Sequence, residues 1–283
     1  MKAVALMYHD VTPPGRGPSS GFPGGDAERY KLTLDRFDRH LDAIDRRAPG
    51  AATTTDSMFG AGCPPPRALP LLLTFDDGGA SAAEWIAGAL ERRGWRGHFF
   101  ITTGYIGRPG FLDAPAIRGL RARGHVVGSH SHSHPLRMAH CSEPRLRDEW
   151  RRSAALLSDI LGAPIVTASV PGGDHSDLVA RTAIEAGIRV LFTSCPTDRV
   201  ARLGDACVFG RYAMQSATPA GAAAALAAGD HVPRMNRRAI WTIKQAGKRL
   251  GGPLYLRIRG RLLGASADMR WGDERSALSK DPS

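Results

Sequence analysis

The stretch Leu72-Leu73-Thr74-Phe75-Asp76-Asp77-Gly78 is an apolar run that ends in two adjacent carboxylates and a glycine. The apolar residues predict a buried strand, and the glycine predicts a turn directly after it. Carboxylates in this position can cap a turn, or they can bind a metal ion and accept a proton. The stretch alone leaves both interpretations open.

Strand-like and helix-like runs alternate along most of the chain around this stretch. Strands are expected over 2–8, 69–75, 98–103, 125–128, 166–170 and 190–193, and helices over 34–44, 82–93, 114–123, 145–161 and 178–186. This alternation is typical of βαβ units and predicts an α/β fold with a parallel sheet. Residues 46–69 are expected to form a loop. Functional residues in such folds follow the carboxyl ends of strands.

A second polar stretch, Gly128-Ser129-His130-Ser131-His132-Ser133-His134-Pro135, also follows a strand-like run. On a helical turn, His130 and His134 would project from the same face. Two imidazoles and one carboxylate are typical of hydrolytic zinc sites, which keep one position open for water. Successive side chains leave an extended strand in opposite directions, so Asp76 and Asp77 are expected to divide the roles of ligand and base. Taken alone, the histidine run could also be a polar surface loop.

The overall composition points to a cytoplasmic protein with anionic partners. The chain of 283 residues has 38 Lys and Arg against 27 Asp and Glu, a net charge of +11. Such a surplus favours anionic substrates, nucleic acid or an anionic membrane surface. The first residues do not read as a signal sequence, and no stretch approaches the length of a membrane span. The four scattered cysteines predict free thiols in a reducing compartment.

The C-terminal part has a different composition and predicts a division into domains 1–230 and 231–283. Its basic residues are interleaved with apolar ones and accompanied by no acid as far as Ala267; they are Arg234, Arg237, Arg238, Lys244, Lys248, Arg249, Arg257, Arg259 and Arg261. A solvated basic helix packed on the main domain is one interpretation. Peripheral contact with an anionic membrane is another. Nucleic-acid binding is not favoured, since no recognised motif accompanies the charge.

Several of these motifs resemble those of the polysaccharide deacetylases, the family with the NodB-type domain. Residues 74–78 match the first family motif, and 128–135 are similar to the second, His-Ser/Thr-x-x-His followed by Pro. The opening Met7-Tyr8-His9-Asp10-Val11 also resembles the start of many members. The resemblance covers about residues 1–215. It implies a distorted (β/α) barrel of the NodB type and hydrolytic removal of an N-acetyl group from an amino sugar.

The same resemblance implies roles for individual residues. Asp77, His130 and His134 would bind a divalent metal, with Zn²⁺ as the expected ion, and Asp76 would be the general base. A backbone N–H near Gly172 would stabilise the oxyanion of the tetrahedral intermediate.

The later motifs depart from the family pattern. Ser169 stands where many members have an arginine that orients the base. Arg211, which we group with Gly172 as a substrate or oxyanion contact, is the candidate to replace that arginine. The late Leu-x-x-His motif that supplies the general acid is missing, and His9 and His175 are the candidates to replace it.

The sequence thus predicts a metal-dependent N-deacetylase acting on a glycan or on a lipid-linked or nucleotide-linked sugar. A hydrolase of another N-acyl or formyl amide at the same metal site is an alternative. A catalytically weak metal- or glycan-binding relative is the other, because the acid motif is missing.

Overall fold

The computed structural model describes residues 1–13, 20–60, 69–173 and 175–242. The chain divides into two units, Met1–Thr242 and Ile243–Ser283, and every described residue belongs to the first. Most of the predicted basic appendage, residues 243–283, therefore lies outside the described residues. Residues 231–242 are helical.

The first unit is built around a curled, largely parallel sheet whose strands run β10-β11-β9-β8-β7-β6-β5-β1-β12, with β4 paired to β5. Its strands are β1 (Val4–Tyr8), β4 (Ala52–Thr53), β5 (Leu71–Phe75), β6 (His98–Ile101), β7 (Val126–Ser129), β8 (Thr167–Ser169), β9 (Val190–Phe192), β10 (Ala201–Leu203), β11 (Ala206–Phe209) and β12 (Tyr212–Ala213). Strands β10 and β11 pair in the antiparallel direction. A separate small sheet pairs β2 (Val11–Thr12) with β3 (Leu32–Thr33).

The two ends of the curled sheet are joined by one short crossing. Strand β11 pairs with β9, whereas β12 pairs with β1 at the other end. Gly210 and Arg211 lie between these two strands. A Cβ atom on Gly210 would lie 2.2 Å from the carbonyl oxygen of Cys195, so the close approach at this crossing requires glycine. The crossing gives the sheet the distorted (β/α) barrel form that the sequence predicted.

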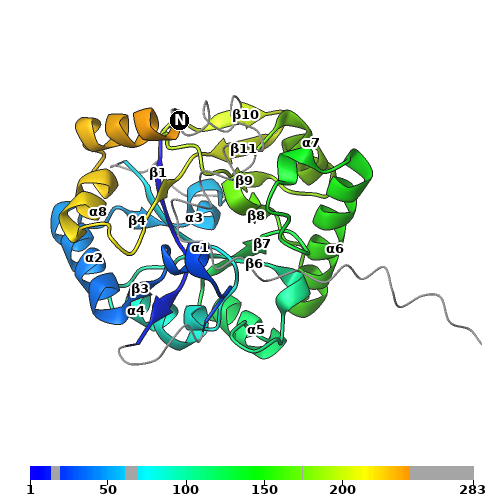
Figure 1. Ribbon diagram of the computed structural model, residues 1–283, viewed down its shortest axis with the longest axis horizontal. Coiled ribbons are helices and arrows are strands. Elements are labelled where there is room, and N and C mark those ends of the chain that lie inside the picture. Colours follow the sequence, from blue (N-terminus) through cyan, green and yellow to red (C-terminus); the bar gives the residue numbers. More distant parts are fainter. Residues whose placement is uncertain (14–19, 61–68, 174, 243–283) are drawn as a thin grey trace, which may run out of the picture. The chain divides into compact units, whose positions relative to one another are not determined.

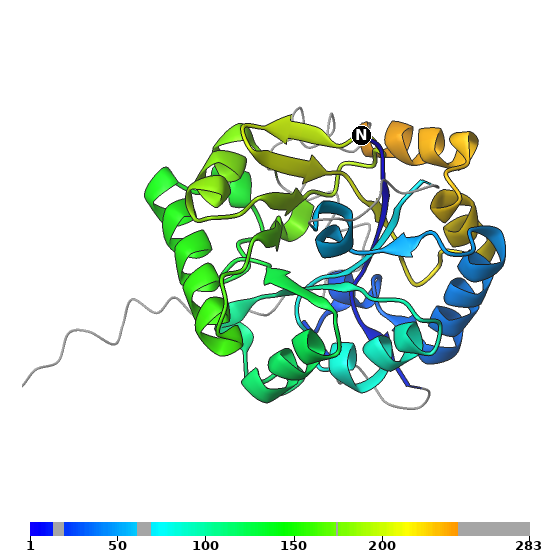
Figure 2. The same cartoon turned by 180° about the vertical axis from the view of Figure 1, so that it is seen from behind.

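Helices surround the barrel (Figure 1). They are α1 (Gly25–Glu28), α2 (Leu34–Arg47), α3 (Thr55–Phe59), a π-helical turn (Ala82–Ile86) continuing into α4 (Ala87–Glu91), α5 (Ala114–Ala122), α6 (Glu143–Leu161), α7 (Asp177–Glu185) and α8 (Ala220–Ala227). Short 3₁₀ turns cover Thr103–Tyr105, Met138–His140 and Pro171–Gly173. The view from behind shows α3 at the end of the barrel where β6 begins (Figure 2). There the amide of Thr55 donates a hydrogen bond to His98, the first residue of β6.

The apolar patterns explain these elements. Phe37, Leu41 and Ile44 are fully buried along one face of α2, and the hydroxyl of Thr33 accepts a hydrogen bond from the amide of Arg36 at its start. Strands β1 and β5 are buried at every position, as expected for central parallel strands covered on both faces.

Two local predictions were wrong. Residues 46–69 contain β4 and α3, which are too short to produce a clear period in the sequence. The segment from His130 to His134 is not helical, because Ser131 and His134 have positive φ angles of 64° and 57°. This non-helical turn, in place of a helix, brings the side chains of His130 and His134 together.

None of the helices described here is sufficiently long and apolar to cross a bilayer. Cys141, Cys195 and Cys207 are free thiols, as predicted, and Cys63 lies outside the described residues.

Candidate active site

The candidate site lies at the rim formed by the carboxyl ends of the parallel strands. Asp76 and Asp77 directly follow β5, and the turn is fixed by hydrogen bonds to both neighbouring strands. The amide of Asp76 donates to the carbonyl of Tyr8 at 3.0 Å, and the amide of Thr102 donates to the carbonyl of Asp77 at 3.2 Å. Asp77 has a φ angle of 78°, so it no longer continues the strand. The two carboxylates consequently reach different partners.

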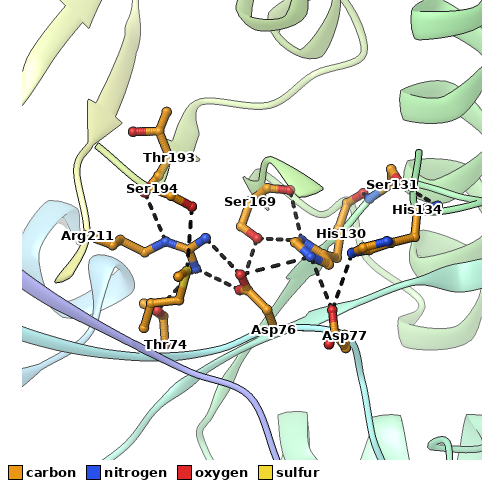
Figure 3. Close-up of polar contacts among 12 residues, drawn as sticks. Thr74, Asp76, Asp77, His130, Ser131, His134, Ser169, Thr193, Ser194 and Arg211 are labelled. Atoms are coloured by element: carbon orange, nitrogen blue, oxygen red, sulfur yellow. Dashed lines mark hydrogen bonds and ion pairs between the residues drawn. The ribbon is translucent and has the colours of Figure 1, made fainter. Parts of the chain in front are cut away.

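Asp77, His130 and His134 form a compact group of potential metal ligands (Figure 3). One ligand atom from each residue lies within 4.8 Å of the others. The Oδ1 atom of Asp77 is 3.4 Å from Nε2 of His130 and 3.5 Å from Nε2 of His134. Burial alone would raise the pKa of Asp77, but hydrogen bonds from both histidines hold it well below its usual value. An ionised carboxylate facing two imidazole nitrogens suits a divalent metal such as zinc.

The orientation of His130 is set by Ser169, the last residue of β8. The Nδ1 atom of His130 lies 2.6 Å from the Ser169 hydroxyl and 3.1 Å from its carbonyl oxygen. Because the hydroxyl in turn donates to Oδ1 of Asp76 at 3.0 Å, Nδ1 of His130 is the donor in this contact. Its Nε2 atom faces Asp77, and this is the nitrogen that would give up its proton and become the lone-pair ligand of a bound metal. The donor set fits a bound metal.

The loop that carries His130 and His134 is anchored to α6 by hydrogen bonds to the side chain of Glu149. This buried carboxylate accepts from the amides of His132 and Ser133 at 3.0 and 2.8 Å, and from the Ser133 hydroxyl. The hydroxyl of Ser131 accepts from the amide of His134 at 3.1 Å. The sequence analysis did not predict a role for Glu149. The feature that could have indicated one is an acidic residue on the apolar face of a helix, beside Trp150.

Arg211 lies against Asp76, although the two residues are 135 positions apart in the sequence (Figure 3). Its Nη1 and Nη2 atoms donate to the two carboxylate oxygens at 2.7 and 2.8 Å. The guanidinium is fully buried and also donates to the Thr193 carbonyl and the Thr74 hydroxyl. Burial by itself would raise the pKa of Asp76, but the charge of Arg211 outweighs it and holds that pKa below its usual value. Arg211 therefore contacts both carboxylate oxygens of Asp76, whereas Ser169 contacts Oδ1 alone.

The two candidate acids are placed very differently. His9 follows β1, and its charge helps to lower the pKa of both Asp76 and Asp77. Its Nδ1 atom is buried with no hydrogen-bond partner among the described residues, and its ring lies on Tyr30 with centroids 4.6 Å apart. His175 is exposed in the loop before α7, and within the described part of the chain no hydrogen bond or ion pair links it to the site.

Two further features border the site. Gly172, in the loop after β8, has a φ angle of 60°, and a Cβ atom there would lie 3.1 Å from the Leu136 carbonyl. The loops after β7 and β8 therefore meet beside the site.

The ring of Phe22 lies against His134 with centroids 4.8 Å apart, and it also contacts the rings of Tyr105 and Phe111. This aromatic wall, which we did not predict, shields one side of the histidine.

Residues 64–191 match the family model described as polysaccharide deacetylase. This segment, just under half of the chain, thus resembles a polysaccharide deacetylase domain. Both predicted motifs fall within the matched segment, so the resemblance is confirmed, and the chain is a hydrolase of carbon–nitrogen bonds other than peptide bonds. No curated protein sequence matches the chain significantly.

Solved structures share the fold. IcaB from Ammonifex degensii is 24% identical, with a TM-score of 0.64 over 80% of this chain and 97% of that one. The deacetylase PplD of Streptococcus pyogenes, in complex with acetate, is 17% identical with a TM-score of 0.61, covering 78% of this chain and 95% of that one. A polysaccharide deacetylase from Bacillus cereus is 17% identical with a TM-score of 0.65, covering 80% and 69%. These likenesses confirm the predicted barrel.

Proposed function

We propose that the deacetylase domain removes the N-acetyl group of an amino sugar in a Zn²⁺-dependent reaction. The observation that carries the proposal is the pairing of a ligand group with a separate base. Asp77, His130 and His134 converge within 4.8 Å, while the adjacent Asp76 is held by Arg211. The amino-sugar substrate is supported by the family description of the matched segment.

Asp77, His130 and His134 would hold Zn²⁺, which when bound lowers the pKa of water and polarises a carbonyl oxygen. Asp76 accepts the proton of the attacking water at a carboxylate oxygen. Its lowered pKa keeps it ionised before the reaction, and Arg211 keeps both of its oxygens oriented. Ser169 connects the base to His130, so that base and ligand are held at a constant separation.

His9 is the residue we assign to the leaving group. Water adds its oxygen to the amide carbon, the carbon–nitrogen bond breaks, and the nitrogen receives a proton from His9. Acetate and a free amine are the products. The position of His9 near both carboxylates supports this assignment, whereas the exposed position of His175 does not. A backbone N–H near Gly172 remains our candidate for the oxyanion contact.

The first test measures acetate release from N-acetylglucosamine oligosaccharides by purified protein, with and without added Zn²⁺. Asp76→Asn should lower kcat by about a hundredfold or more, since general base catalysis contributes about 10²–10⁴. Asp159→Asn is the matched control, because Asp159 is exposed and has no hydrogen bond or ion pair with another described residue. Full activity in the Asp76 variant would exclude the mechanism.

The second test separates the two histidines. His9→Gln should slow hydrolysis of the acetamide much more than hydrolysis of an activated acetate ester, because only the amine leaving group needs a proton. His175→Gln should slow neither reaction. Equal losses on amide and ester in the His9 variant would refute its role as the acid.

A further inference from the structure

A groove of about 540 Å³ lies beside the candidate active site. It is lined by Pro135, Leu136, Arg137, His140, Cys141, Ser142 and Arg145, and we call it the 135–145 groove. Pro135 directly follows the ligand His134. The carbonyl of Leu136 packs beside Gly172, in the loop after β8. The groove therefore begins at the residue next to a metal ligand and extends outward along the loop before α6.

The groove is cationic because its two arginines are not neutralised. Neither Arg137 nor Arg145 forms an ion pair with a carboxylate of the described residues, and both are exposed. Arg137 donates through Nη2 to Nε2 of His140 at 2.7 Å, which orients its guanidinium and uses one of its five N–H groups. Ser142, at the start of α6, forms no side-chain cap to the helix.

The carboxylates in the first half of α6, the part nearest the groove, are engaged elsewhere. Glu143 pairs with Arg147, which also pairs with Glu185. Asp148 pairs with Arg152 at 3.5 Å, and Glu149 accepts the hydrogen bonds of the histidine loop. Among the arginines of α6, Arg147 and Arg152 thus have acidic partners. Arg145 and the neighbouring Arg137 line the groove without a carboxylate partner among the described residues.

We infer that the 135–145 groove binds an oxyanion carried by the substrate, a phosphate or a uronate carboxylate on the N-acylated sugar or on its neighbour. This inference rests on the proposed function. Guanidinium groups match both kinds of oxyanion, because their planar array of N–H donors can contact two oxygens at once. The site would then distinguish anionic from neutral N-acetyl sugars, and the net charge of +11 would favour their approach.

The test compares three substrates that contain N-acetylglucosamine. They are its neutral disaccharide, N-acetylglucosamine 6-phosphate, and a disaccharide of N-acetylglucosamine with glucuronate. With the zinc-loaded wild-type protein, kcat/KM should be at least about tenfold higher for an anionic substrate. The double variant Arg137→Gln/Arg145→Gln should raise KM for that substrate by about tenfold, the usual worth of one charge-assisted hydrogen bond. Its kcat and its activity on the neutral substrate should not change.

Arg151→Gln is the matched control, because Arg151 is an exposed arginine of α6 that does not line the groove and has no ion pair within the described residues. A preference for only one anion would identify phosphate or carboxylate as the natural group. Equal kcat/KM for all three substrates, or a double variant that behaves as wild type, would overturn the inference.

A calorimetric titration keeps this outcome separate from failure of the proposed function. N-acetylglucosamine 6-phosphate and free glucuronate are titrated into chelator-treated protein, so that neither ligand can bind to zinc. Binding that is lost in the double variant supports the groove even if no acetamide is hydrolysed. Hydrolysis of all substrates with no such binding supports the proposed function and refutes the groove.

Discussion

Arg211→Met removes the partner of the proposed base from the interior of the barrel. In the wild-type protein two hydrogen bonds of 2.7 and 2.8 Å join the guanidinium to Asp76, and both side chains are almost completely buried. Methionine fills a similar volume without charge. The substitution therefore leaves a buried carboxylate whose largest source of stabilisation is gone.

The expected loss can be estimated in two ways. Two unit charges about 4 Å apart attract by about 4 kcal/mol at an effective dielectric constant of about 20. Removing one partner of a buried ion pair costs about 3–5 kcal/mol in measured cases. We therefore expect the free energy of unfolding to fall by about 3–5 kcal/mol, a large part of the about 5–15 kcal/mol typical of a folded domain.

Urea unfolding of the metal-free protein near neutral pH measures this loss, and a double-mutant cycle with Asp76→Asn isolates the pair. The double variant buries no charge at either position, so its loss should be smaller than the sum of the two single losses by about 2–3 kcal/mol. Arg211→Lys keeps the charge but not the planar pair of donors and should recover part of the loss. Arg151→Met, at an exposed position, should change stability by less than about 0.5 kcal/mol.

The reasoning is refuted if Arg211→Met loses less than about 1 kcal/mol, or if the losses of the two single variants simply add in the double variant. Additive losses would mean that each side chain contributes to packing but not to a mutual charge interaction. A stable Arg211→Met protein with full deacetylase activity would also remove Arg211 from the proposed site.

Three other predictions concern the histidines and their support. Glu149→Gln should weaken Zn²⁺ binding by about 10–100-fold in a chelator competition, because it loosens the histidine loop, whereas Asp148→Asn, exposed on the same helix, should not. Burial lowers the pKa of His98 from 6.5 to about 4, and its Nε2 accepts from the Thr55 amide. As pH falls, the unfolded chain protonates His98 before the folded protein does, so the free energy of unfolding should fall by about 3 kcal/mol between pH 6.5 and 4. Urea unfolding at several pH values should show that His98→Gln lacks this decrease. The same pH dependence of stability in wild type and variant would contradict the prediction. Zn²⁺ at about 100 times its Kd should stabilise the metal-free protein by about 2.7 kcal/mol in thermal unfolding, and His134→Ala should abolish the effect.

Much of the fold and half of the site follow from local sequence patterns. The predicted strand over 69–75 is observed as Leu71–Phe75, and the helix over 145–161 as Glu143–Leu161, because both have strong periodicity and clear ends. Asp76, Asp77, His130 and His134 could be placed at one rim, since parallel strands bring their carboxyl ends to the same edge of the sheet. Short elements such as α3 carry too few residues to show a period and were missed.

The sequence by itself placed Asp76, Asp77, His130 and His134 after strand ends, because that position is a local property of the chain, and the family resemblance predicted which of them would be ligands and which the base. Only the tertiary structure decided what surrounds them. Arg211 reaches Asp76 because the crossing from β11 to β12 closes the barrel, and a contact across that closure has no local signature. Glu149 supports the histidine loop, and His9 approaches the carboxylates, for the same reason: packing between distant segments of the chain sets both positions.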